Sequence, residues 1–181
     1  LISFGGLLRT DVLSGFLLLA TVFFALMVAI YSLRYMAGRA GQRLYYSSFL
    51  WSLGLACGVL LAGDALLLVA FWGPLAVTLY LMIELSGGGA SQAARKTLIL
   101  VGGTDAILLL GAALMWIERD STALVGEPLG LHGASSYLAF FCFVAAAFAK
   151  AAAMPLHTWL PDSAEKAHAP VTALLPASID K

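Results

Sequence analysis

The sequence predicts an all-α membrane protein whose helices cross the bilayer several times. Of its 181 residues, 61% are hydrophobic and 11% are charged, whereas soluble domains carry about 25% charged residues. The mean hydropathy is +0.94. Apolar segments of roughly 20 residues recur along the chain, and this length spans a hydrocarbon core about 30 Å thick. A soluble fold of this composition would expose large apolar surfaces to water, so we predict a polytopic transmembrane helical bundle.

Five apolar segments meet or approach the length of a membrane span, and a sixth starts near the end of the sequence. Gly63 and Asp64 form a short break, which predicts a helical hairpin with Asp64 capping a helix at the interface. The chain starts without Met and ends inside a predicted helix, so we expect a fragment of a longer protein. We treat residues 1–181 as one membrane domain with spans at about 11–33, 46–62, 64–85, 97–117 and 134–154, and a sixth starting near 169.

The charges of the connecting segments predict the orientation. Arginines at 34, 39 and 43 lie between spans one and two, and Arg95 and Lys96 lie between spans three and four. The positive-inside rule places both connections in the cytoplasm. The acidic segment 118–135 then lies outside, and the segment 155–168 lies inside or dips back into the bundle.

Several function classes are excluded. The formal net charge is zero, so the chain lacks the basic footprint of a nucleic-acid-binding protein. Cys57 and Cys142 lie in apolar runs and form no metal-ligand spacing. The sequence contains no nucleophile elbow and no dinucleotide-binding fingerprint.

Lys150 is the outstanding ionisable residue inside a predicted span. A charge at membrane depth costs at least about 2.5–3.5 kcal/mol, so such residues mark candidate functional sites. Most of its near neighbours in sequence are alanines, whose small side chains let helices approach closely. The amine then faces the bundle, where desolvation would make it a proton acceptor. The alternative is a snorkelling lysine whose amine reaches the interface, and the residues alone do not separate the two.

Four other residues are weaker candidates. Pro155 predicts a broken or kinked helix, which either lines an ion pathway or simply ends the helix. Asp105 is a proton-relay carboxylate or a structural group hydrogen-bonded to a neighbouring helix, and we favour the second interpretation. Glu84, near the end of span three, is expected at the interface. His157 could titrate near physiological pH, although histidines in loops are more often bystanders.

A longer motif carries a family resemblance. Residues 150–171 read Lys-Ala-Ala-Ala-Met-Pro-Leu-His-Thr-Trp-Leu-Pro-Asp-Ser-Ala-Glu-Lys-Ala-His-Ala-Pro-Val. This segment resembles the signature of the proton-conducting membrane transporter family, which includes antiporter-like subunits of respiratory complex I, Mrp sodium/proton antiporter subunits and membrane subunits of group 4 energy-converting hydrogenases. Residues 175–181 are most similar to the hydrogenase-type branch. Supporting similarities lie at residues 9–14, 34–36, 62–68 and 71–72.

The resemblance implies a fold and a set of site residues. Subunits of this family contain two inverted five-helix repeats, and spans two to six would form most of the first. Lys150 matches the lysine of the broken helix, the central proton-accepting site. Lys181 matches the group that passes the proton onward, and His157 matches a position often occupied by histidine.

One position departs from the family pattern. The family carries a glutamate after Phe-Trp, whereas this sequence reads Phe71-Trp72-Gly73-Pro74. Glu84 lies eleven residues further on, about 16 Å along a helix, and is a poor substitute. Either another carboxylate such as Asp105 replaces the glutamate, or the subunit has weakened or lost conduction.

The sequence therefore predicts a proton-translocating, antiporter-like subunit of a complex I-like or hydrogenase-like redox-driven pump. We expect a multi-pass protein of a prokaryotic inner membrane that acts with other membrane subunits and a peripheral redox arm. It would translocate protons, or exchange them for sodium, and would bind no flavin, iron–sulfur cluster or metal. The alternative is a non-conducting structural subunit of such a complex. A substrate transporter is less consistent with the few polar side chains in the spans. A quinone-processing subunit is less consistent still, because no Tyr/His pair in a cavity is evident from the sequence.

Overall fold

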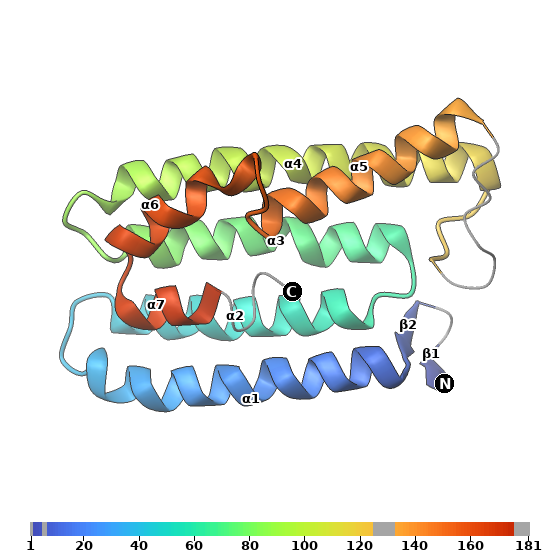
Figure 1. Cartoon of the computed structure of the whole chain (residues 1–181). Coiled ribbons are helices and arrows are strands. Elements are labelled where there is room, and N and C mark those ends of the chain that lie inside the picture. Colours follow the sequence, from blue (N-terminus) through green and yellow to red (C-terminus); the bar gives the residue numbers. More distant parts are fainter. Residues whose placement is uncertain (1, 5–6, 125–132, 176–181) are drawn as a thin grey trace.

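The computed structural model describes residues 2–4, 7–124 and 133–175 as a bundle of antiparallel helices (Figure 1). The long helices are α1 (Val12–Tyr35), α2 (Gln42–Leu61), α3 (Ala65–Glu84), α4 (Ala90–Arg119) and α5 (Ala134–Lys150). They are followed by the 3-10 helix η1 (Leu156–Thr158), α6 (Trp159–Lys166) and α7 (Ala169–Leu174). The predicted all-α bundle is confirmed. The one departure within the described residues is a short antiparallel pair, β1 (Ile2–Phe4) and β2 (Leu8–Thr10).

Among the described residues, α1 to α4 are each long and apolar enough to cross a membrane, and α5 is a shorter apolar helix. Large apolar side chains cover the outside of the bundle, as on α1, where Val12 is 93% and Phe16 is 69% exposed. An apolar surface of this extent is unfavourable in water and favourable in lipid. The chain is an integral membrane protein.

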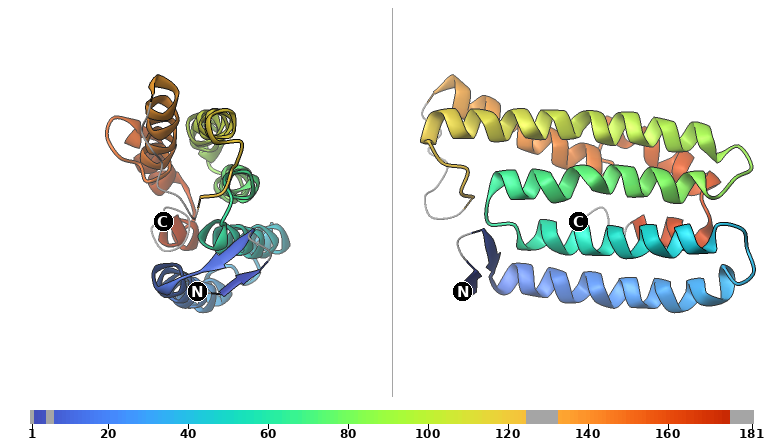
Figure 2. Two further views of the ribbon diagram at one scale, coloured as in Figure 1. Left: turned by 90° about the vertical axis from the view of Figure 1, so that its right-hand side faces the viewer. Right: turned by 180° about the vertical axis from the view of Figure 1, so that it is seen from behind.

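Successive long helices pack side by side, with α4 between α3 and α5, as the two rotated views show (Figure 2). Small residues set the closest approaches. A Cβ atom at Gly111 of α4 would lie 2.9 Å from Cys142 Cβ and 3.3 Å from the Ala139 carbonyl oxygen on α5. A Cβ at Gly58 would lie 2.6 Å from the Phe71 ring. These glycines therefore permit the short interhelical distances that membrane bundles depend on.

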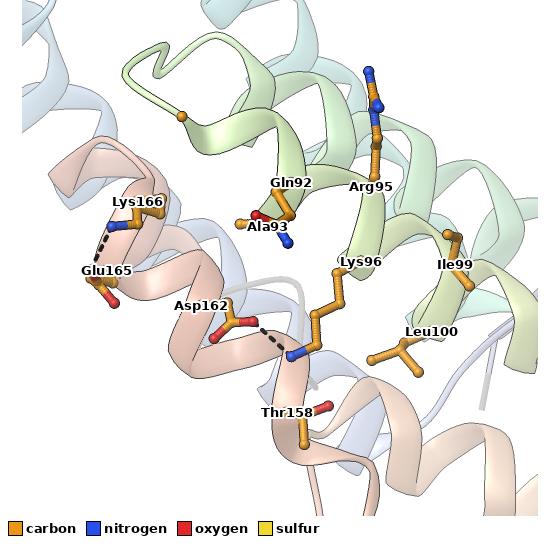
Figure 3. Close-up of a pocket in the computed structure, with 11 residues that line it drawn as sticks. Gln92, Ala93, Arg95, Lys96, Ile99, Leu100, Thr158, Asp162, Glu165 and Lys166 are labelled. Atoms are coloured by element: carbon orange, nitrogen blue, oxygen red, sulfur yellow. Dashed lines mark hydrogen bonds and ion pairs between the residues drawn. The ribbon is translucent and has the colours of Figure 1, made fainter.

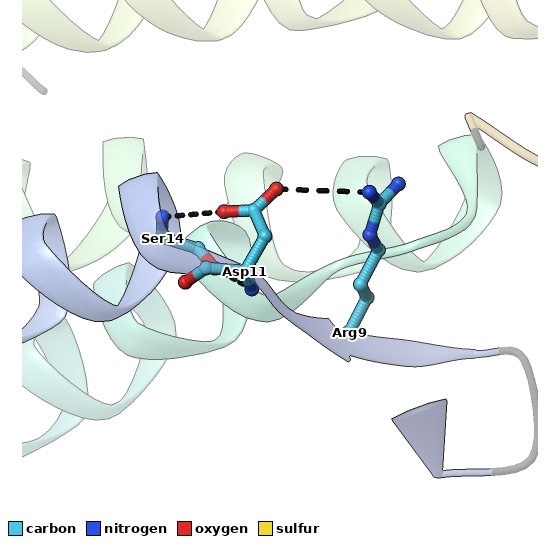
Figure 4. A network of polar contacts seen from close by, with 3 residues as sticks. All are labelled: Arg9, Asp11 and Ser14. Carbon is cyan, nitrogen blue, oxygen red and sulfur yellow. Dashed lines mark hydrogen bonds and ion pairs between the residues drawn. The ribbon is translucent and has the colours of Figure 1, made fainter. Parts of the chain in front are cut away.

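Two aspartates start helices at the same end of the bundle. Asp11 caps α1: the Ser14 N–H donates to Asp11 Oδ1 at 2.7 Å, and the Asp11 N–H donates to Ser14 Oγ at 2.8 Å (Figure 4). Arg9 lies 3.9 Å from Asp11 Oδ2. The main-chain and hydroxyl hydrogen bonds from Ser14 lower the pKa of Asp11. Asp64 caps α3 by accepting from the N–H groups of Leu66 and Leu67.

Asp64 also joins the α2–α3 turn to the segment after α4. Thr122 Oγ1 donates to Asp64 Oδ2 at 2.5 Å, and the Ala65 N–H donates to the Thr122 carbonyl at 2.8 Å. The Leu124 N–H donates to the Gly63 carbonyl at 3.0 Å. These hydrogen bonds fasten the acidic side of the bundle together.

The α1–α2 and α3–α4 connections lie at the opposite end, beside the α6–α7 turn (Figure 1). At this basic end the His168 N–H donates to Ser86 Oγ at 2.8 Å. The His168 ring packs edge-on against the Tyr35 ring. The Arg39 guanidinium lies over the same Tyr35 ring, 4.2 Å from its centroid. The start of α7 is thus held by both basic connections.

Some helix boundaries differ from the predicted spans, and α2 starts at Gln42, four residues before the predicted start. Helix α4 starts at Ala90, seven residues before the predicted apolar span, because its first turns carry helix-forming alanines together with charged residues that extend beyond the bilayer core. Helix α5 ends at Lys150, although the predicted span continues to about residue 154. Ala152 adopts a left-handed conformation with φ 49°, which terminates the helix before Pro155 is reached. Helix α7 starts at Ala169, where the sixth span is expected.

Candidate functional site

The side chain of Lys150 is directed into the bundle. It is 4% exposed, and its Nζ donates to the main-chain carbonyl oxygen of Trp72 on α3 at 2.8 Å. The same Nζ lies 4.5 Å from the centroid of the Trp72 indole ring, within the range of a cation–π interaction. Of the two orientations left open by the sequence, the structure has the one that faces the bundle.

The end of α5 sets the position of this lysine. The Ala153 N–H donates to the Phe148 carbonyl at 2.8 Å and the Ala152 N–H donates to the Ala149 carbonyl at 3.2 Å. This pair of hydrogen bonds, with Ala152 in the left-handed region, forms a Schellman motif. Lys150 is the last helical residue, where the negative end of the helix dipole stabilises a cation.

Trp159, at the start of α6, contacts the end of α5. Its ring is 1% exposed, and its Nε1–H donates to the Ala149 carbonyl at 2.9 Å. After η1 and the cis Met154–Pro155 bond, α6 packs on α4 through the Thr97–Ser163 hydroxyl pair at 2.7 Å. The chain around Lys150 is therefore a helix, a break and a second helix, as the sequence predicts.

Asp105 is the carboxylate that the fold brings to this site. It lies half-buried on α4 and interacts electrostatically with Lys150 and with the Trp72 indole. Its Oδ1 is buried and accepts no hydrogen bond, and Trp72 Nε1 is buried and donates none. Both interpretations of Asp105 stay predictions. Helices α3, α4 and α5 thus contribute an indole, a carboxylate and an amine to one place.

Helix α3 contains a proline near the same place. Pro74 lies inside α3 and has no N–H to donate to the carbonyl four residues earlier. Gly73 precedes it, and a Cβ added at Gly73 would meet nothing within 4 Å. The position of the family glutamate is therefore an open space beside Trp72.

Glu84 lies apart from Lys150. Glu84 ends α3, twelve residues and about 18 Å beyond Trp72, and its Oε1 accepts from Ser91 Oγ at 2.6 Å. His157 lies in η1, and its Nδ1 is buried without a hydrogen-bond partner. Lys181 lies outside the described residues.

Sequence reasoning missed two participants. It did not identify the Trp72 carbonyl and ring as partners of Lys150, and it gave no role to the Trp159 indole. No local signal identifies the Trp72 carbonyl, because Pro74 frees the carbonyl of Ala70, four residues earlier.

Several known proteins are similar to this chain. The NAD(P)H-quinone oxidoreductase chain 4 1 of Synechococcus sp. (strain JA-3-3Ab) is 34% identical over 137 residues, covering 74% of this chain and 26% of the relative. The NADH-quinone oxidoreductase subunit N of Desulforudis audaxviator (strain MP104C) is 30% identical over 178 residues, covering 94% of this chain and 35% of the relative. The chain spans about a quarter to a third of the length of these relatives.

Solved structures share the fold. A chain of the Mrp complex from Dietzia sp. DQ12-45-1b superposes with a TM-score of 0.88 at 28% identity, covering 96% of this chain and 20% of that chain. A chain of respiratory complex I from Thermus thermophilus gives a TM-score of 0.86 at 24% identity, with 99% and 40% covered. Residues 62–181 match the family described as NADH:quinone oxidoreductase/Mrp antiporter, TM. Since this match covers more than half of the sequence, the chain belongs to the family of antiporter-like membrane subunits.

Proposed function

We propose that this chain forms part of a proton-translocating, antiporter-like subunit in which the Lys150 amine takes up protons and passes them on. The observation that carries the proposal is the burial of this amine, 4% exposed, at the point where α5 breaks. A lysine at membrane depth costs free energy, and the residue is retained where it serves an ion pathway.

Opposing interactions act on the protonated amine. The Trp72 carbonyl, the face of its ring and the Asp105 carboxylate stabilise the charge, whereas burial among apolar side chains destabilises it. A small displacement of α5 relative to α3 and α4 changes this balance. The amine can then bind a proton in one arrangement and release it in the other.

The onward step rests on the resemblance. In the family pattern, Lys181 receives the proton from the lysine of the broken helix. The transported ion is a proton, with sodium as the exchanged ion in an antiporter. His157, between the break and α6, is a candidate for proton delivery to the site.

The relatives suggest the setting. They are named as subunits of quinone oxidoreductases, and one structural relative is part of an Mrp complex. We propose that this chain acts among other membrane subunits in a prokaryotic cell membrane. A peripheral redox arm would supply the driving force, and the chain would carry no redox centre of its own.

One observation favours a second function. Gly73 replaces the glutamate of the family pattern, and the space beside it is open. A subunit that lacked the counter-charge would be a structural member of the complex without conduction. Asp105, which approaches from α4, is the reason we prefer the conducting function.

The test uses the native complex in proteoliposomes, with redox turnover and proton uptake recorded together. Lys150→Ala should abolish proton uptake through this subunit while the complex still assembles. Arg43→Ala is the matched control, because it removes an exposed charge from the first turn of α2 and should leave uptake unchanged. Normal uptake in Lys150→Ala would overturn the proposal.

Gly73→Glu separates the two functions. In a conducting subunit it adds a second carboxylate beside Lys150 and changes the rate of proton uptake. In a structural subunit, it changes neither uptake nor turnover.

A further inference from the structure

A groove separates the first turns of α4 from α6 at the basic end of the bundle (Figure 3). Its volume is about 730 Å³, within the range of pockets that hold small ligands. The residues that decide its chemistry are Gln92, Arg95, Lys96, Ile99, Leu100 and Asp162. It does not include the Lys150 site.

The charges of the groove leave one cation for a ligand. Lys96 Nζ lies 2.7 Å from Asp162 Oδ2, and Lys166 Nζ lies 2.6 Å from Glu165 Oε1. Arg95 is exposed and forms no ion pair with any described residue. Figure 3 shows its guanidinium directed away from Asp162, at the rim. The groove therefore has three cations against two carboxylates, with the excess charge at its rim.

The polarity of the groove changes along α4. Gln92, Arg95 and Lys96 lie in the first two turns, and Ile99 and Leu100 follow one turn later, where Ile99 is 71% exposed. From Gln92 to Leu100 the helix rises about 12 Å. A ligand that follows this face meets hydrogen-bond donors and cations first and apolar side chains next, which is the order of a phospholipid headgroup and its acyl chains.

We propose that this groove binds an anionic phospholipid, with the phosphate held by Arg95 and Lys96 and an acyl chain lying along Ile99 and Leu100. Basic pockets between membrane helices on the cytoplasmic side take such headgroups. The planar guanidinium of Arg95 matches a phosphate with two parallel hydrogen bonds. The Lys96–Asp162 ion pair is partly exposed, with 39% and 48% of the two side chains accessible. Because an exposed ion pair is weak, the Lys96 amine can also bind the phosphate.

The location favours a lipid over a segment of a partner protein. The groove lies at the level of the basic connections, where the positive-inside rule places anionic lipid. The proposal is independent of conduction through Lys150.

The first experiment needs no variant. The native complex is placed in nanodiscs of phosphatidylcholine that contain a trace of phosphatidylglycerol with a photo-activatable acyl chain. After irradiation, crosslinks should map to residues 96–104 of α4 and to α6, and should be several times weaker with photo-activatable phosphatidylcholine. Equal labelling by both lipids, or labelling confined to other helices, overturns the proposal.

The second experiment tests the headgroup contacts. Arg95→Gln should lower phosphatidylglycerol crosslinking about fivefold, as expected for the loss of one cation near a headgroup. Arg95→Lys should retain most of it. Arg43→Gln, an exposed arginine at the same end but outside the groove, should leave it unchanged. An equal loss of phosphatidylglycerol crosslinking in Arg95→Gln and Arg43→Gln would show general attraction of the lipid to the basic surface, which contradicts the proposal. A crosslink from position 95 to a neighbouring subunit would show that a protein occupies the groove, which also contradicts it.

Discussion

The Lys150 amine donates to the main-chain carbonyl of Trp72 at 2.8 Å and lies 4.5 Å from the centroid of that residue's ring. One residue of α3 thus holds the amine in two ways. The carbonyl remains when the side chain is replaced, so substitutions at Trp72 report on the ring alone.

The first prediction concerns this ring. Trp72→Phe keeps an aromatic face and should reduce proton uptake only a few-fold. Trp72→Leu removes the face, and a desolvated cation–π interaction of about 2 kcal/mol corresponds to roughly a thirtyfold loss. Proton uptake at fixed redox turnover in proteoliposomes measures both. Equal effects of Phe and Leu would mean that the ring only fills space.

The second prediction concerns the counter-charge. Asp105→Asn keeps the shape of the side chain and removes its charge. At an effective dielectric constant of about 20, two unit charges several ångströms apart interact by more than about 1 kcal/mol, so proton uptake should fall roughly tenfold. Glu84→Gln is the matched control, because Glu84 binds Ser91 at the far end of α3 and should have little effect on uptake. The reverse result would assign the role of the missing glutamate to Glu84.

The third prediction concerns the end of α5. Ala152 has φ 49°, a conformation that glycine adopts without the steric cost of a Cβ. Ala152→Gly should therefore raise the free energy of unfolding by about 0.5–1 kcal/mol. Ala151→Gly, at φ −72°, should lower it by a similar amount. Thermal unfolding of the purified protein in detergent compares the two, and stabilisation by both or by neither would contradict the Schellman geometry.

The fourth prediction concerns the clamp between the α2–α3 turn and the segment after α4. Thr122→Val keeps the shape and removes the hydroxyl that donates to Asp64. Loss of a hydrogen bond to a charged group should lower the free energy of unfolding by about 1.5–3 kcal/mol. Ser121→Ala removes a hydroxyl whose bond, 3.2 Å from the Ala123 nitrogen, is longer, and should cost less. Thermal unfolding is again the measurement, and equal losses would contradict a specific role for Asp64.

The fifth prediction concerns pH. Burial, followed by the charge of Arg39, lowers the pKa of His168 below 6.5, while the Leu85 carbonyl acts in the opposite direction. Protonating His168 therefore costs more in the folded protein than in the unfolded one. The stabilisation is complete above pH 6.5 and is lost as the pH falls through and below that value. Tyr35 and Ser86 also contact this residue.

Melting temperatures measured from pH 8 to pH 5 test this dependence. The wild type should lose stability below about pH 6.5, the unperturbed pKa of histidine, and His168→Gln should show a flatter profile. Arg39→Gln removes one cause of the shift, so the folded-state pKa of His168 rises toward 6.5 and the acid loss becomes smaller. Parallel profiles for the wild type and His168→Gln would assign the acid sensitivity to other groups.

The sequence by itself determined the class of protein, the break in the fifth helix and the choice of Lys150 as the candidate site. Apolar runs of about 20 residues can satisfy their backbone in lipid only as helices. Pro155 prevents a continuous helix, and a lysine among alanines has no inexpensive place in a span. These conclusions depend on residues near one another in the chain, so no three-dimensional information was required.

Only the tertiary structure decided which groups meet Lys150. The spans are apolar on most of their surface, so periodicity does not reveal how each helix is rotated about its axis or shifted along it. The packing of α3, α4 and α5 places Trp72 and Asp105 beside the amine and leaves Glu84 near the basic end. It also ends α5 at Lys150, because the left-handed Ala152 and the Trp159 indole satisfy the last carbonyls. Contacts between residues 78 positions apart, such as Trp72 and Lys150, follow from packing, which local sequence does not encode.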